Sequence, residues 1–409
     1  MNKTPLRNYA RLIARKGVNV QKGQEVVIFA ELDQPAFAEM VAEECYRAGA
    51  ETVLMEWQHQ PMSKLHMRYR SLETLSRIEE WELAKLRHRV DTLPAMIYLE
   101  SSDPDGMNGI DQEKLARSSQ ARYPILKPFR DEMENKYQWC IAAVPGAAWA
   151  KKVFPGCTKF QAVEKLWQAI LYTSRADGPD PMAAWDEHNA DLKARCAYLN
   201  GLQATALEYK SASGTDFRVG LIPDAQFLAG SETTLGGGVA FQPNIPSEEV
   251  FTSPKAGDAE GIVVTSRPLS FRGELIEDFS ITFEKGRAVD VKAAKNEALL
   301  RTMIGMDEGS ALLGECALVP YDSPIRNSEI LFYNTLFDEN AACHLALGAG
   351  FPNCIRDYDR YTLEECRAKG INDSMIHQDF MIGTEDLSVD AVTADGKRVA
   401  VFRGGNWAF

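Results

Sequence analysis

The first third of the chain alternates short apolar runs with longer stretches of helical spacing, and this alternation limits the possible folds more than any other feature. The apolar runs occupy residues 26–30, 52–57, 95–100 and 139–144. Apolar residues recur at helical spacing over 36–47 and stop at Gly49, a residue type that commonly ends a helix. Strands that are apolar on both faces and separated by helices are typical of a covered parallel sheet. The pattern predicts an α/β domain with a doubly wound, mostly parallel sheet.

A segment rich in Pro, Gly and Asp at residues 174–181 interrupts this alternation. A chain of 409 residues is also too long for one typical hydrophobic core. A helical stretch follows from residue 182 to about 200, and later segments such as 205–209 and 277–283 alternate apolar and polar residues as antiparallel strands do. We therefore expect an α/β N-terminal domain at residues 1–180 and an α+β C-terminal domain at residues 181–409.

Motifs for nucleotide binding are absent from the sequence. Neither the glycine-rich P-loop nor the dinucleotide fingerprint occurs, and the glycine cluster 236–238 has no Lys-Ser/Thr after it, so we expect a flexible turn there. The eight cysteines include no C-x-x-C pair, which indicates reduced, structural thiols rather than a zinc ribbon or a redox motif.

The charge and hydropathy patterns restrict the partners. The net charge is −13 and the basic residues are scattered among acids, so we expect no nucleic-acid partner. No run of 18 uncharged apolar residues occurs, which argues against a membrane span. The start, residues 1–17, has helical spacing without an apolar signal-peptide region. These observations predict a cytoplasmic protein.

Two of the six histidines, His344 and His377, lie near carboxylates in the C-terminal half. In an extended segment, residues i and i+2 project to the same side, so His377 and Asp379 could share one metal ion. The alternative is a capped or solvated pair. His344 lies in a segment of small residues that we predict to be helical over 339–348, where a lone histidine is more commonly a core residue.

Several acids accompany these histidines in apolar surroundings. Glu315 heads an apolar, strand-like run, and Glu248 and Glu249 lie between a proline turn and an apolar pair. An unpaired buried charge is costly, and these segments contain no Lys or Arg to compensate it. Two divalent cations would neutralise the acids, which are Glu249, Glu315, Glu339 and Asp379. Alternatively, each acid taken alone is a helix cap or a surface residue.

Four motifs carry a resemblance to a known family. They are residues 244–254 (NIPSEEVFTSP), 313–315 (LGE), 339–348 and 377–383 (HQDFMIG). In these motifs, in their order and spacing, and in the N-terminal segments 9–13 and 17–23, the sequence resembles the aminopeptidase T and aminopeptidase S family of dinuclear metallo-aminopeptidases. This family is also called the thermophilic metalloprotease family. The resemblance covers nearly the whole chain.

The resemblance implies a two-domain, homodimeric enzyme that hydrolyses the N-terminal peptide bond of short peptides. It implies two divalent ions per chain, which would be zinc, cobalt, or magnesium or manganese. The C-terminal domain would bind them and be catalytic. Alignment of the motifs favours Glu249 over Glu248 as a ligand. The implied metal ligands are Glu249, Glu315, His344, His377 and Asp379, with Glu339 a further ligand or an active-site acid.

One departure from the family concerns residue 351. The family usually carries a tyrosine seven residues after the first ligand histidine, and this chain has Phe351 there. A tyrosine hydroxyl can donate a hydrogen bond to the oxyanion of the tetrahedral intermediate, which is worth about 2 to 4 kcal/mol for one donor. Tyr358 or Tyr361 could supply the missing hydroxyl.

The sequence leaves the remaining roles open. Glu248, Glu339 and Glu385 are candidates for the acid/base that moves the proton to the leaving amine. Glu385 and Asp386 could bind the substrate's α-amine or lie in an exposed turn. An alternative function, suggested by Phe351, is a catalytically weakened metal-binding scaffold or peptide-binding homologue. A phosphoester hydrolase would need basic residues for the phosphate, and the motifs contain almost none.

Overall fold

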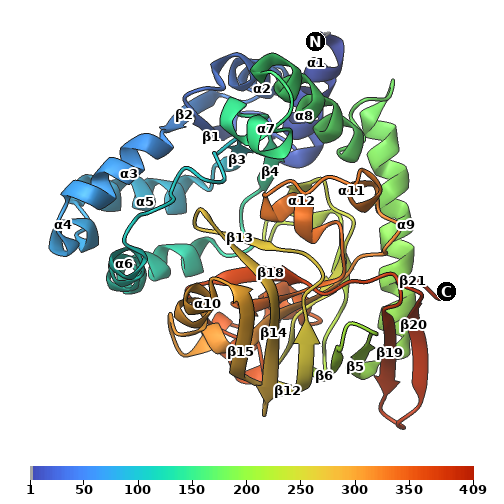
Figure 1. Cartoon of the computed structure of the whole chain (residues 1–409). Coiled ribbons are helices and arrows are strands. Elements are labelled where there is room, and N and C mark those ends of the chain that lie inside the picture. Colours follow the sequence, from blue (N-terminus) through green and yellow to red (C-terminus); the bar gives the residue numbers. More distant parts are fainter. Residues whose placement is uncertain (1–2) are drawn as a thin grey trace. The chain divides into compact units, whose positions relative to one another are not determined.

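The computed structural model describes residues 3–409, which form two compact units (Figure 1). The first unit extends to residue 189 and includes residues 230–247, and the second contains residues 190–229 and 248–409. Helix α9 (Pro181–Leu202) begins in the first unit and ends in the second. The division between residues 180 and 181 stays a prediction. The compact units differ from it in two ways, because the first unit extends into α9 and also includes residues 230–247.

The first unit contains the predicted parallel sheet. Its strands are β1 (Glu25–Glu31), β2 (Thr52–Gln58), β3 (Ala95–Glu100), β4 (Trp139–Ala143) and the short β10 (Asn244–Ile245). All pairs are parallel and the order is β10-β4-β3-β1-β2. The predicted fold class is confirmed, although β10, which joins from residues 230–247, was not foreseen.

Helices connect these strands, as the spacing predicts. They are α1 (Lys3–Leu12), the π-helix η1 (Ile13–Gly17), α2 (Pro35–Ala48), α3 (Gln60–Tyr69), α4 (Leu72–Ser76), α5 (Glu80–Thr92), α6 (Gln112–Met133), α7 (Ala147–Val153) and α8 (Lys159–Thr173). Gly49 ends α2 at a φ of 115°, which favours glycine. Met1 and Asn2, part of the predicted helical start, lie outside the described residues.

The second unit is α+β, as predicted. Its nine-stranded sheet consists of β5 (Ala204–Lys210), β6 (Asp216–Leu221), β12 (Pro254–Val264), β13 (Leu269–Phe271), β14 (Glu274–Glu284), β15 (Arg287–Lys295), β19 (Ser388–Thr393), β20 (Arg398–Arg403) and β21 (Asn406–Trp407). A second sheet has the order β18-β17-β16-β11-β7, with β7 (Leu228–Ala229), β11 (Val250–Thr252), β16 (Leu313–Leu318), β17 (His344–Gly348) and β18 (His377–Met381). A shared apolar core lies against both sheets.

Short helices join these strands. They are α10 (Glu297–Ile304), α11 (Pro324–Asn327), α12 (Thr335–Glu339), α13 (Leu363–Lys369) and the 3-10 turns η2 (Gly309–Ala311), η3 (Pro352–Cys354) and η4 (Tyr358–Arg360).

The helix predicted over residues 339–348 is wrong. Helix α12 ends at Glu339, and His344 begins strand β17. Alanine and leucine favour helices, but strand β17 is fully buried between β16 and β18, and tertiary packing overrides the intrinsic preference. Gly348, the last residue of the predicted helix, ends the strand instead.

Three smaller features of the sequence can be located in the structure. Gly236 and Gly238, both at positive φ, lie in the turn between β8 (Glu232–Thr233) and β9 (Ala240–Phe241). All eight cysteines are free thiols, and all but Cys157 are buried. Among residues 3–409, no helix is both long and apolar enough to cross a bilayer.

Limited proteolysis tests the predicted boundary. Residues 177–180 are exposed and lie outside helices α8 and α9, so we expect the first cut there. Because β10 pairs with β4 within the first unit, the two fragments should remain associated until they are denatured. Early cuts elsewhere, with a stable fragment that spans residues 178–181, would contradict the boundary.

Candidate metal centre

The second sheet of the second unit presents polar side chains on one of its faces. Strand pairing places Glu315 opposite Ala346 and Ala346 opposite Asp379, so these three residues share a face. His344 and His377, which pair with Ala317 and Gly348, lie on the same face. The other face carries Cys316, Leu345 and Phe380, which pack into the apolar core. The pairing therefore collects residues that are distant in the sequence.

A β-bulge adjusts the position of Glu315. The pairing of β16 with β17 shifts between Leu313 and Glu315. At Gly314, which lies in the bulge, an added Cβ would be 2.1 Å from the carbonyl oxygen of Ala349. Only glycine fits this close approach of two backbones, and bulges are frequent beside functional sites. The glycine of the LGE motif thus has a structural reason.

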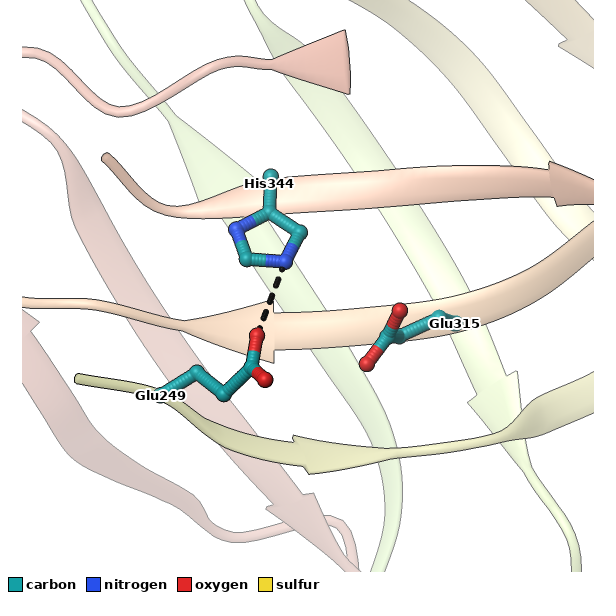
Figure 2. Close-up of side chains that lie close together, drawn as sticks. All are labelled: Glu249, Glu315 and His344. Carbon is teal, nitrogen blue, oxygen red and sulfur yellow. Dashed lines mark ion pairs between the residues drawn. The ribbon is translucent and has the colours of Figure 1, made fainter. Parts of the chain in front are cut away.

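The ligand atoms form two overlapping groups. Glu315 on β16, His344 at the start of β17 and Glu249 just before β11 point toward one another (Figure 2), with one ligand atom from each lying within 4.8 Å of the others. His344 Nε2 is 3.1 Å from Glu249 Oε2. Glu315, His377 and Asp379 form the second group by the same criterion. His377 Nε2 is 3.1 Å from Glu315 Oε2 and 3.4 Å from Asp379 Oδ1. Glu315 belongs to both groups.

Burial and the charges of neighbouring side chains shift the pKa values of the acidic residues in this cluster. Burial, opposed by the hydrogen bond from His377, raises the pKa of Glu315 to about 7. Burial and the carboxylates of Asp379, Glu249 and Glu315 raise the pKa of Glu339 well above its usual value. Burial opposes ionisation of Asp379, but the adjacent His377 lowers its pKa to about 2. The cluster contains four carboxylates and two imidazoles, and the repulsion among the carboxylates favours a proton or a cation between them.

The donor set fits divalent cations. The carboxylates of Glu249, Glu315, Glu339 and Asp379 are all buried, and no Lys or Arg within residues 3–409 forms an ion pair with them. Asp379 Oδ1 is buried and has no hydrogen-bond partner in the described part of the chain. Imidazole nitrogens with carboxylate oxygens suit zinc, cobalt and manganese, and oxygen donors suit magnesium.

Backbone carbonyls orient both imidazoles. His344 Nδ1 lies 3.0 Å from the carbonyl oxygen of Ala342, and His377 Nδ1 lies 2.7 Å from that of Ala349. A proton on Nδ1 in each ring leaves Nε2 free for a cation, which is the usual arrangement for metal-binding histidines. Sequence reasoning missed these contacts because Ala342 and Ala349 contribute backbone carbonyls, which no side-chain pattern marks.

Two polar residues that the sequence did not single out hold the loops around the centre. Asn340 Oδ1 accepts a 2.7 Å hydrogen bond from the amide of Glu248, next to Glu249. Asp307 accepts hydrogen bonds from the Ser374 hydroxyl and the Met375 amide, just before His377. Asn340 lies inside the motif at residues 339–348, whereas none of the four motifs contains Asp307.

The other predicted site residues, Glu248, Glu385 and Asp386, differ in their exposure to solvent. Glu248 is buried, whereas Glu385 and Asp386 lie in an exposed turn after β18, where Asp386 accepts hydrogen bonds from Thr384 and Ala212. This arrangement supports the exposed-turn interpretation for Glu385 and Asp386.

Phe351 lies at the centre, and the two proposed substitutes pack elsewhere. The Phe351 ring centroid is 4.8 Å from that of His377 and 5.5 Å from that of Phe251. Tyr358 and Tyr361 pack against a separate apolar cluster around Ile222 and Ile355. Their positions do not support either hydroxyl as a replacement for the missing phenol.

Comparisons with known proteins agree with this geometry. The chain is 41% identical to aminopeptidase AmpS of Bacillus subtilis, over 99% of this chain and 98% of that protein. It is 38% identical to aminopeptidase T of Thermus thermophilus over the same shares. The solved structure of wild-type AmpT from Thermus thermophilus matches with a TM-score of 0.88 and 36% identity, covering 100% of both chains. The match to the thermophilic metalloprotease (M29) family spans residues 2–407, and the chain therefore belongs to that family.

Proposed function

We propose that this protein is an aminopeptidase that removes the N-terminal residue from short peptides and uses two divalent metal ions. The observation that carries this proposal is the position of Glu315 in both ligand groups, since one shared carboxylate is suited to bridge two adjacent ions. The ions would be zinc, cobalt, magnesium or manganese. The proposed ligands are Glu249, Glu315, Glu339, His344, His377 and Asp379.

The protein's own residues would divide the work around these ions. When bound, divalent ions at such a site lower the pKa of water and polarise the scissile carbonyl. Glu339, buried beside Asp379, is better placed than the exposed Glu385 to accept a proton and return it to the nitrogen of the leaving amine. Phe351 places an apolar ring beside the His377 imidazole, at a tilt of 45°.

The activity assay uses a leucine anilide, a dipeptide, and the same dipeptide with an acetylated N-terminus. We expect cleavage of the first two and none of the third, with loss of activity in a chelator and recovery on addition of cobalt, zinc, magnesium or manganese. Equal cleavage of the acetylated peptide would exclude an aminopeptidase. Metal-dependent peptide binding without turnover would instead support the weakened homologue that Phe351 suggests.

Two further expectations accompany this proposal. From the family resemblance we expect a homodimer, which light scattering of the full-length protein can test. We also expect a cytoplasmic location, which fractionation of the source cells can test.

The substitution Phe351→Tyr tests whether the missing phenol limits the rate. If the added hydroxyl donates to the oxyanion, kcat should rise by about tenfold or more with little change in KM, because the gain arises only in the transition state. Phe251→Tyr, which alters the ring packed against Phe351, serves as the control. An unchanged or lower kcat for Phe351→Tyr would show that this position does not limit catalysis through a phenol.

A further inference from the structure

A second candidate site lies in the first unit, at the carboxyl ends of its parallel strands. In the order β4-β3-β1-β2, strand β1 has β2 on one side and β3 on the other, so the winding direction of the sheet reverses at β1. Open α/β sheets bind ligands in the crevice outside the carboxyl ends of their strands at this point. A cavity of 440 Å³ lies there, lined by the segments that follow β1, β2 and β3. Its size is typical of small-molecule sites.

One wall of the cavity presents two ordered carboxylates without a basic partner. Ser102 donates a 2.9 Å hydrogen bond to Glu31 Oε1, and the buried Ser101 donates a 3.3 Å hydrogen bond to Asp33 Oδ1. Within residues 3–409, neither Glu31 nor Asp33 forms an ion pair, whereas the nearby Asp105 is neutralised by Lys152 at 2.8 Å. No basic side chain of the described residues therefore compensates Glu31 or Asp33.

The opposite charge comes from helix α3. Lys64 lines the same cavity, is partly buried, and has no ion-pair partner in the described chain. The remaining lining includes the apolar side chains of Leu32, Pro61 and Ala148. The cavity thus combines an acidic wall, one free ammonium and a small apolar surface.

The start of α3 is fixed to the segment after β3, which gives the cavity a preformed shape. Gln60 donates a 3.0 Å hydrogen bond to the carbonyl of Asp103 and accepts a 3.1 Å hydrogen bond from the Asp103 amide. An added Cβ at Gly106 would lie 2.1 Å from Gln60 Oε1, so the glycine permits this close contact. A site held in this way loses little entropy when a ligand binds.

We propose that this cavity binds a free α-amino acid as its zwitterion. The ammonium would contact Glu31 and Asp33, the carboxylate would contact Lys64, and the side chain would lie on Leu32, Pro61 and Ala148. A phosphate ligand does not fit, because the last residue of β1 and the turn after it supply two acids and no glycine. Free amino acids are products of the proposed activity, but the binding itself does not rest on that activity.

Calorimetry with the full-length protein in a chelator tests the site apart from the metal centre. The probes are L-leucine, leucinamide, which lacks the carboxylate, and N-acetyl-leucine, which lacks the ammonium. We expect saturable leucine binding that Asp33→Asn weakens about tenfold or more, as the loss of a charge-assisted hydrogen bond should. Lys64→Met should weaken leucine binding and leave leucinamide binding unchanged. Asp131→Asn and Lys85→Met, which alter charges outside the cavity, serve as controls.

Three outcomes would overturn the proposal. The first is no saturable binding up to about 10 mM, a concentration that would detect even weak ligands. The second is binding that His344→Ala abolishes and Asp33→Asn leaves intact, which would assign the ligand to the metal centre. The third is equal affinity for leucine and N-acetyl-leucine. Glu31→Gln replaces Asp33→Asn if the latter fails to fold by circular dichroism.

Discussion

The substitution Glu315→Gln is expected to lower kcat/KM for a leucine anilide by about 10³-fold or more. Glu315 is the residue shared by both ligand groups, so its charge contributes to both proposed ion sites. A neutral amide binds divalent cations poorly, and the ions supply several kcal/mol of transition-state stabilisation, where about 1.4 kcal/mol corresponds to tenfold in rate. Steady-state kinetics with added metal, together with elemental analysis, gives the activity and the ion occupancy.

The matched control for this prediction is Glu44→Gln. Glu44 is also a buried glutamate, but it lies in the first unit, where it pairs with Arg47 at 2.8 Å. This change should reduce stability without altering kcat or ion occupancy. Full activity of Glu315→Gln with two bound ions would refute a bridging role for Glu315.

The substitution Glu339→Gln is expected to change protein stability in opposite directions with and without bound ions. With the ions bound, the variant lacks a ligand and should be less stable than the wild type. Ions present at about 1,000 times their dissociation constant stabilise the native state by about 4 kcal/mol, part of which the variant would lose. Thermal and urea unfolding of both proteins, with metal and with chelator, gives the comparison.

Without ions the sign reverses because of the raised pKa of Glu339. Burial and the carboxylates of Asp379, Glu249 and Glu315 raise this pKa in the folded state. A group with a raised pKa destabilises the folded protein increasingly as the pH rises above the unfolded pKa, which for glutamate is about 4.3. In chelator at pH 8, Glu339→Gln should therefore stabilise the protein, and near pH 4 the gain should vanish.

The neighbouring Asp338 supplies the contrast. Burial also raises the pKa of Asp338, but this carboxylate pairs with the largely buried Arg267 at 3.2 Å. Asp338→Asn would leave that guanidinium without its partner and should destabilise the protein in both metal and chelator. A Glu339→Gln variant that behaves like Asp338→Asn in both conditions would show that Glu339 does not belong to a cation site.

Elements that depend on local signals could be predicted from the sequence, whereas elements that depend on contacts between distant residues could not. The strands of the first unit were predictable because apolar runs and a helix-ending glycine are local signals. The segment 339–348 was mispredicted because burial between two strands, not local preference, decides its structure. The joining of β10 to β4 and the position of Glu315 in two groups depend on pairings between distant residues. No local pattern encodes such pairings.

Counting the bound ions tests the central claim most directly. Metal-reconstituted, dialysed protein should carry about two divalent ions per chain by elemental analysis, as expected for paired ions in hydrolases. His344→Ala and His377→Ala should each lower this number while the protein remains folded by circular dichroism. Two ions in the wild type with reduced occupancy in both variants would support the proposed centre. No bound ion, a single ion at saturating metal, or an occupancy that neither substitution changes would contradict it.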